Sequence, residues 1–330
     1  MVCNCHAHFN SAREPWFKAV THAASPISME PMIIKPTVSI CMISYKHGKF
    51  IAQAIESILS QDVDFSIELV IGDDCSPDET AIICEEFARR DQRVRLLSRE
   101  QNLGVMRNFT RTLLACSGTY IAVCEGDDYW TDPHKLRKQV EFLDAYPDFA
   151  GAANQSDVIA DNQFVRKFKM SVPGTIVTND LIAGRLFHTA SVVFRREVVD
   201  LFCQAPLVLS CDRLLNFCIS FIGKIHYSEE TMCAYRLHGG GMSSNVTVEQ
   251  LKLDLSCINY LKSIEPSFSS LKYRSYVYAT IGLCRLATPS QKTFYLAVSF
   301  LLSFVNFPQN LIIYGAHFGR AIKLRLLPHP

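Results

Sequence analysis

The chain has 330 residues, of which 48% are hydrophobic and 20% are charged, an ordinary balance for a globular protein that excludes a disordered chain. The formal net charge is +1 at pH 7, and we expect no nucleic-acid partner. No acidic residue follows Glu265, while the 65 residues after it contain seven lysines and arginines. The first 265 residues therefore carry a charge of −6 and the rest +7. A tail with charges of one sign indicates contact with an anionic surface.

The cysteines and the N-terminal segment bear on the compartment. The sequence has 13 cysteines, an odd number, and several stand inside apolar runs, as Cys41 and Cys124 do. This pattern favours buried free thiols in a reducing cytosol over a disulfide framework. The first 30 residues contain no apolar core of a signal peptide, so we expect a cytoplasmic protein. Residues 1–32 show no periodicity and are expected to be a disordered extension.

The first half alternates between apolar runs and helical periodicity. Strands are predicted at 38–43, 67–71, 94–97 and 120–124, and helices at 51–59, up to about 90, and 105–116. A further helix is expected to start with Asp132 as its N-cap and Pro133 at its first position. Strands that alternate with helices predict an α/β fold, with a Rossmann-like, mostly parallel sheet flanked by helices.

The second half is more mixed. Strands are expected at 191–194 and 232–235, with a helix from about 212 to 222 between them. From Val248 the pattern is helical, so residues 246–330 are predicted to form a C-terminal helical extension. The apolar run from Tyr295 to Phe307 is too short for a bilayer span, which needs about 20 residues. A buried helix is one explanation, and a membrane-surface contact on the inner face of the cytoplasmic membrane is the one we favour.

Polar residues cluster where three predicted strands end. The clusters are Ser44-Tyr45, Asp73-Asp74 and Glu125 to Asp128, and the carboxyl ends of parallel strands are where open sheets bind ligands. Adjacent aspartates repel each other unless a cation or hydrogen-bond donors compensate them. Two such pairs at one sheet edge indicate a hard cation, Mg²⁺ or Mn²⁺, that also binds phosphate oxygens. No glycine-rich phosphate loop is present, so Arg107 and Arg236 are candidates to hold phosphates.

The segments at these strand ends resemble the motifs of family 2 glycosyltransferases. They are 38–46, 67–80 (IELVIGDDCSPDET), 102–108 (NLGVMRN) and 122–136 (AVCEGDDYWTDPHKL). The resemblance implies a GT-A fold and transfer of a sugar, with inversion, from a nucleotide-diphosphate donor. It assigns 33–150 to nucleotide-sugar and metal binding and 151–245 to acceptor binding.

The resemblance also implies roles for individual residues. Those implied in nucleotide binding are Ser44, Tyr45, Asp74, Arg107 and Asp127. Those implied in metal binding are Glu125, Asp127, Asp128 and His238, the last in a closing loop with three glycines after Arg236. The sequence departs from the family at Ile43 and Lys46, where proline and asparagine are usual, and at Glu125, where the first carboxylate is usually an aspartate.

The acceptor side rests on Asp212, which matches the family's acidic motif and is implied to be the catalytic base. The alternative is that Asp212 caps a helix. Arg236 and His188 are implied to contact the diphosphate or the acceptor. We expect a UDP-sugar donor and a glycan or lipid-linked acceptor, as in surface polysaccharide assembly. A nucleotidyltransferase and a degenerate subunit that only binds nucleotide sugars remain alternatives.

Overall fold

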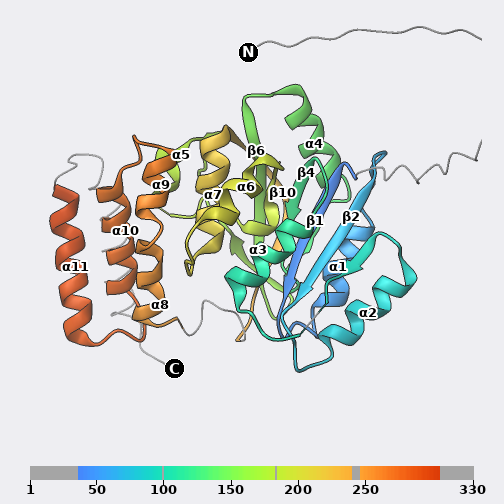
Figure 1. The fold of residues 1–330 in the computed structure, drawn as a ribbon, viewed down its shortest axis with the longest axis horizontal. Coiled ribbons are helices and arrows are strands. Elements are labelled where there is room, and N and C mark those ends of the chain that lie inside the picture. The colour runs from blue at the N-terminus through green and yellow to red at the C-terminus, as the bar shows by residue number, and fades with distance from the viewer. Residues whose placement is uncertain (1–35, 99, 183, 240–245, 305–330) are drawn as a thin grey trace, which may run out of the picture. The chain divides into compact units, whose positions relative to one another are not determined.

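A computed structural model describes residues 36–98, 100–182, 184–239 and 246–304 (Figure 1). The predicted disordered extension at 1–32 lies outside the described residues, as do most of the glycine loop and the chain beyond residue 304. The described residues belong to one compact unit that starts at Lys35.

One sheet holds strands from both halves of the chain. The strands are β1 (Val38–Ser44), β2 (Ile67–Asp73), β3 (Val94–Leu96), β4 (Tyr120–Val123), β5 (Tyr129–Trp130), β6 (Phe149–Ala160), β7 (Gln163–Lys167), β8 (Thr175–Ile176), β9 (Val193–Arg195) and β10 (Lys224–Leu237). Their order is β3-β2-β1-β4-β9-β6-β10-β5, with β7 paired to β6 and β8 to β10. The pairs β1-β2, β2-β3, β1-β4 and β6-β10 are parallel.

The short strand β9 joins the two halves because it runs antiparallel to both of its neighbours, β4 and β6. Two reversals restore the direction, so β6 and β10 point the same way as β1, β2 and β4. The carboxyl ends of all five strands therefore meet at one edge of the sheet. The expected α/β fold with a mostly parallel sheet flanked by helices is confirmed.

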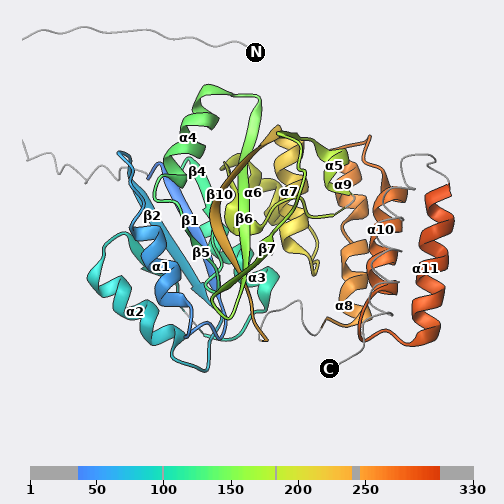
Figure 2. The same cartoon turned by 180° about the vertical axis from the view of Figure 1, so that it is seen from behind.

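Helices flank this sheet and continue beyond it. They are α1 (Ile51–Leu59), α2 (Thr80–Arg90), α3 (Val105–Ala115), α4 (Lys135–Ala145), α5 (Thr178–Ile182), α6 (Glu197–Gln204), α7 (Cys211–Ile222), α8 (Val248–Lys252), α9 (Ile258–Ile264), α10 (Ser270–Gly282) and α11 (Pro289–Phe304). Figures 1 and 2 show α8 to α11 beyond α7, on the side away from β2, with α11 outermost. The expected C-terminal helices are present. None of the described helices is both long and apolar enough to cross a bilayer.

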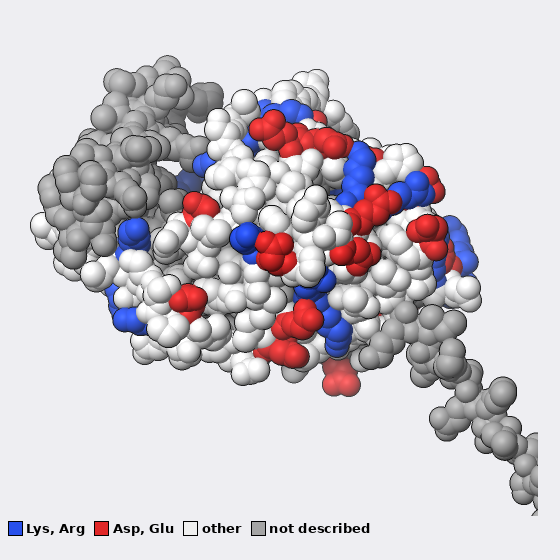
Figure 3. Space-filling model, turned by 90° about the horizontal axis from the view of Figure 1, so that it is seen from above, with Lys and Arg blue, Asp and Glu red and all other residues white. Residues whose placement is uncertain are grey.

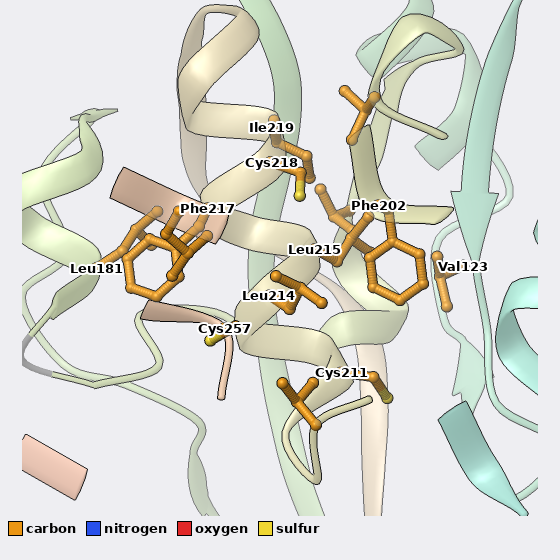
Figure 4. Packing of buried hydrophobic residues seen from close by; sticks show 14 of the residues in the cluster. Val123, Leu181, Phe202, Cys211, Leu214, Leu215, Phe217, Cys218, Ile219 and Cys257 are labelled. Carbon is orange, nitrogen blue, oxygen red and sulfur yellow. The ribbon is translucent and has the colours of Figure 1, made fainter. Parts of the chain in front are cut away.

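Two apolar cores lie on opposite faces of the sheet because side chains alternate along a strand. In β1, Cys41 belongs to one core, whereas Ile40 and Met42 belong to the other. The first core continues onto α7, where Leu215 lies beside Phe202 of α6 (Figure 4). All eleven cysteines in the described residues are free thiols.

One local expectation was wrong, one strand boundary differs and one strand was missed. Helix α4 begins at Lys135, because Asp132 turns its carboxylate back to the amide of His134 at 2.8 Å instead of capping the helix. The strand expected at 191–194 is β9, which starts at Val193 after a 3₁₀ turn. Strand β6 was not predicted, because its small and polar residues (AGAANQS) have low strand propensity and are buried only by their neighbours.

Candidate active site

The polar clusters noted in the sequence meet at the edge where the parallel strands end. Asp74 donates its amide to the Ser44 carbonyl at 2.9 Å, which joins the ends of β2 and β1. Gly126 donates its amide to the Ile43 carbonyl at 3.0 Å and so brings the segment after β4 against the end of β1. Strand β10 delivers Arg236 to the same edge, because it runs parallel to these strands.

Gly126 permits the close contact between these loops. A Cβ atom on Gly126 would lie 2.5 Å from Cδ1 of Ile51, 3.0 Å from Cβ of Ser44 and 3.0 Å from Nδ1 of His47. No side chain larger than hydrogen fits there without moving one of these neighbours. The glycine therefore fixes the position of Glu125 and Asp127, which flank it.

Asp128 is buried and held from two sides. Its Oδ1 accepts the amide of Arg236 at 2.9 Å, and its Oδ2 lies 3.4 Å from Nε2 of His188. The Nδ1 atom of His188 accepts the amide of Ala190 at 3.3 Å, so the ring proton is on Nε2 and points at Asp128. Burial and the nearby Arg185 lower the pKa of His188 to about 3, which keeps the ring neutral.

Glu125, Asp128 and His188 form the metal-ligand cluster found among the described residues. The His188 tautomer leaves no free lone pair on Nε2, and this favours His188 as a support for Asp128 over a ligand. The Oε2 atom of Glu125 is buried and has no hydrogen-bond partner among the described residues. Glu125 therefore offers an unused acceptor at the centre of the cluster.

Asp127 faces two histidines. Its Oδ2 lies 3.0 Å from Nε2 of His238 and 3.6 Å from Nε2 of His47. Burial works against ionisation, but the His238 hydrogen bond and the charges of both histidines bring the pKa of Asp127 below its usual value. The carbonyl of Asp127 accepts Nη1 of Arg236 at 2.7 Å, and Nη2 of Arg236 donates to Gln53.

The negative charges of Glu125, Asp127 and Asp128 repel one another. Burial, followed by the charges of Asp127 and Asp212, raises the pKa of Glu125 to about 8. Burial, followed by the charges of Asp127 and Glu125, also raises the pKa of Asp128. Carboxylates that resist joint ionisation are typical of sites completed by a cation. The residues present thus fit a divalent cation.

Asp212 lies in the first turn of α7, whose N-cap is Ser210. The idea that Asp212 caps this helix is therefore wrong. Its Oδ2 accepts Nη1 of Arg185 at 3.0 Å, and the two side chains are 18% and 42% exposed. The charge of Asp212 is also one of the causes, after burial and Asp127, that raise the pKa of Glu125.

The residues expected to bind the nucleotide are less tightly grouped. Asp74 is buried, and its two carboxylate oxygens accept the amides of Leu103 and Gly104 at 2.7 and 2.9 Å. Ser44 donates to Asp73 at 3.2 Å, while Tyr45 is 42% exposed. Asp74 thus orients the loop that leads into α3.

Two further features belong to this region. Arg107 is exposed in the first turn of α3. Lys46 has a φ of 62° and Cys75 a φ of 57°, so the turns after β1 and β2 both enter the left-handed region. Asparagine tolerates this region better than lysine, which gives a physical reason for the asparagine that is usual at position 46. Backbone strain of this kind concentrates at ligand sites.

Sequence reasoning missed His47, Gln53 and Arg185. His47 could have been predicted as a site residue, because it follows the first strand within the polar turn that starts at Ser44. Arg185 could not have been predicted from the sequence, because it lies before the motif-like segment at His188. The fold alone brings it to Asp212. His238 is described, but the adjoining residues 240–245 of the glycine loop lie outside the described residues.

Known sequences similar to this chain include glycosyltransferases. Residues 39–200 match the profile of Glycosyl transferase family 2. The uncharacterized protein Rv1520 of Mycobacterium tuberculosis is 35% identical over 222 residues, or 65% of this chain and 63% of the relative. TuaG of Bacillus subtilis, provisionally named a teichuronic acid biosynthesis glycosyltransferase, is 27% identical over 64% of this chain and 83% of its own length. The chain thus spans 63% of the length of the mycobacterial relative.

Solved structures share the fold. S. aureus TarS 1–349 in complex with UDP-GlcNAc aligns with a TM-score of 0.62 at 18% identity, covering 80% of this chain and 79% of TarS 1–349. The mannosyltransferase PcManGT of Pyrobaculum calidifontis, in complex with GDP-Man and Mn²⁺, aligns with a TM-score of 0.52 at 17% identity, covering 88% and 81%. At these identities the likeness establishes the fold alone.

Proposed function

We propose that the protein transfers a sugar from a UDP-sugar to a hydroxyl of a glycan or lipid-linked acceptor, because residues 39–200 match the profile of Glycosyl transferase family 2. Inversion at the anomeric carbon is part of the proposal. The observation that carries it is the cluster of Glu125, Asp127 and Asp128, partly or fully buried at the edge where the parallel strands end, with Asp212 raising the pKa of Glu125. The three carboxylates would bind a cation that contacts the donor phosphates, and Asp212 would be the base.

The cation site consists of Glu125, Asp127, Asp128 and His238. Glu125 supports this role through its buried, unpartnered Oε2, and His238 through its contact with Asp127. A bound Mg²⁺ or Mn²⁺ would supply positive charge that stabilises the diphosphate as it leaves. Arg236, already anchored to the Asp127 carbonyl, adds a second positive charge beside the diphosphate.

Ser44, Tyr45, Asp74 and Arg107 hold the uridine in this proposal. The exposed Tyr45 offers a ring face at the end of β1, and Asp74 fixes the backbone of the loop before α3. Arg107, in the first turn of α3, is free to turn toward a phosphate or a base. The preference for uridine over guanosine rests on the family resemblance of Asp74 and Arg107.

Asp212 acts as the base. As the acceptor oxygen bonds to the anomeric carbon, its proton passes to Asp212, and the bond to the UDP oxygen breaks with its electron pair leaving on UDP. Attack from the face opposite the leaving group inverts the carbon without a covalent sugar-enzyme intermediate. General-base catalysis of this kind contributes about 10²–10⁴-fold. His188 contributes by holding Asp128 of the cation site.

The acceptor, the compartment and the biological role also belong to the proposal. A relative named for teichuronic acid biosynthesis favours surface polysaccharide assembly. The acid-free chain after Glu265 favours a cytoplasmic enzyme that works peripherally on the inner face of the membrane.

A thermal-shift screen tests the donor. Nucleotide sugars are added with and without Mn²⁺, and a ligand at 100 times its Kd stabilises the native state by about 2.7 kcal/mol. We expect Mn²⁺-dependent stabilisation by UDP and at least one UDP-sugar. Release of UDP from that sugar then separates an enzyme from a protein that only binds. No stabilisation by any nucleotide diphosphate would contradict the proposal.

A further inference from the structure

The contact between α10 and α11 is made by small and polar side chains. Oγ of Ser275 donates to the Ser299 carbonyl at 3.0 Å, and Oγ of Ser299 donates to the Ser275 carbonyl at 2.6 Å. A Cβ atom on Gly282 would lie 2.6 Å from Cγ of Leu296, so the two helices approach closely. Ser303 is also buried. Small residues and interhelical hydrogen bonds are typical of helix pairs packed in an apolar environment.

The outward face of α11 has the opposite character. Phe294 is 61% exposed, Phe300 47% and Leu301 65%, and Ala297 between them is exposed as well. Their spacing of three and four residues places them on one side of the helix. The helix has a single charged residue, Lys292, which is partly buried. In a helix that faces water, the large apolar residues normally point inward.

Along the chain, the charges that precede and enter α11 are of one sign, although Glu249 of α8 pairs with Lys252, which lies over the ring of Tyr295 in α11. The described chain from 266 to 304 contains Lys272, Arg274, Arg285 and Lys292 and no acidic residue. Arg285 is exposed in the turn before α11, between the exposed Leu283 and Leu286. On the face seen in Figure 3, most of the described acidic side chains lie over the centre and right, interspersed with lysines and arginines.

We propose that the outward face of α11, together with Leu283 and Leu286, docks onto an anionic phospholipid surface. The 16 residues of α11 are too few to span a bilayer, so the helix lies in the interface with its apolar side immersed and the nearby cations at the headgroups. The choice of lipid rests on charge complementarity. It also rests on the proposed function, because a lipid-linked acceptor would be presented at such a surface.

A direct connection joins this face to the candidate base. Arg213, next to Asp212 in α7, lies over the ring of Tyr276 in α10 at 3.8 Å and also contacts the ring of Tyr273 at 5.0 Å. Nη2 of Arg213 donates to the carbonyl of Ile182 at 3.1 Å. The helix that carries the base is therefore packed on the helix that supports α11, and docking would hold the acceptor side of the site near the membrane.

Vesicle sedimentation of the full chain tests the docking. Vesicles of equal parts phosphatidylcholine and phosphatidylglycerol are compared with phosphatidylcholine alone, at low and high salt. We expect sedimentation with the anionic vesicles that weakens with salt. The double variant Phe294→Glu, Leu301→Glu should partition at least about tenfold less, because it removes two immersed apolar side chains. The control is Ile82→Glu in α2, where Ile82 is 59% exposed, and it should sediment like wild type.

Wild-type protein that stays in the supernatant, or a double variant that still sediments fully, would overturn the docking. A dimer that the double variant dissociates would show that a second copy covers the face. Sedimentation that appears only after deletion of 305–330 would show that this segment covers it, and would overturn the proposal as well. Donor binding without vesicles is measured in parallel, so failed docking with intact UDP binding leaves the proposed function standing.

Discussion

Arg185 and Asp212 form an ion pair, with Nη1 of Arg185 3.0 Å from Oδ2 of Asp212. The neighbouring Asp212 raises the pKa of Arg185, so the guanidinium stays charged. Arg185 is 42% exposed and Asp212 18%, which leaves one side of the pair accessible. The pair orients the proposed base and adds a positive charge next to an otherwise acidic site.

Removal of the arginine should slow turnover without weakening donor binding. In Arg185→Ala, Asp212 loses the partner that orients it, so kcat for UDP release should fall about tenfold, the typical value of a hydrogen bond to a charged group. KM for the donor should stay near wild type, and Arg185→Lys should restore part of kcat. Arg137→Ala is the matched control, because Arg137 pairs with Asp62 at 2.9 Å on the surface. A wild-type kcat in Arg185→Ala would show that Arg185 does not orient the base.

Asp212→Asn tests the base itself. The amide keeps the size of the side chain but cannot accept the acceptor's proton, so turnover should fall by about 10²–10⁴-fold while UDP and Mn²⁺ bind normally. Because Ser210, not Asp212, is the N-cap of α7, the unfolding free energy should change by about 1 kcal/mol or less. Steady-state kinetics and calorimetry check the two effects separately. Turnover near that of wild type would move the search to other acidic residues.

Gly126→Ala tests the close approach of the loops. A Cβ atom there meets Cδ1 of Ile51 at 2.5 Å and Cβ of Ser44 at 3.0 Å, so either these side chains or the segment that carries Glu125 and Asp127 must shift. We expect a loss of about 1–3 kcal/mol of stability together with weaker UDP binding. Gly174→Ala is the control, because a Cβ atom on Gly174 meets nothing within 4 Å. Equal stability and UDP affinity in the two variants would show that the loops tolerate the added methyl group.

The nucleotide preference is tested by calorimetry with UDP and GDP in the presence of Mn²⁺. We expect UDP to bind more tightly, because Asp74 and Arg107 resemble the family's uracil site. Arg107→Ala should weaken UDP binding without a change in unfolding temperature, since Arg107 is an exposed side chain. Tighter binding of GDP than of UDP would contradict the assignment.

The sequence predicted the fold best where local signals and tertiary structure agree. Strand β1 is an apolar run and α1 has a regular apolar face, and both lie where expected. Strand β6 has neither signal, because alanine, glycine and asparagine at 150–154 form a strand only between β9 and β10. The N-cap signal at Asp132 was misleading, because an aspartate can close a turn on its own amide neighbours as readily as it caps a helix.

The site residues could likewise be predicted only where the sequence carries a local signal. Glu125, Asp127 and Asp128 could be found because they stand within four residues directly after a predicted strand, and the structure brings Arg236, His238 and His188 to them. The pairing of Arg185 with Asp212 could not be found, because it joins two segments with no common periodicity. The sequence also could not show that the carboxylate of Asp74 accepts hydrogen bonds from the amides of Leu103 and Gly104. Every residue other than proline has a backbone amide, so residue types do not reveal such a contact.

The central claim is that the carboxylate cluster holds a divalent cation needed to transfer sugar from a UDP donor. The most direct measurement is UDP release from a panel of UDP-sugars, with Mn²⁺ or with excess EDTA, in wild type and in Asp127→Ala. The account predicts release from at least one donor with Mn²⁺, and loss of release both in EDTA and in Asp127→Ala, which should unfold at the wild-type temperature. Full activity in excess EDTA, or in Asp127→Ala, would contradict it.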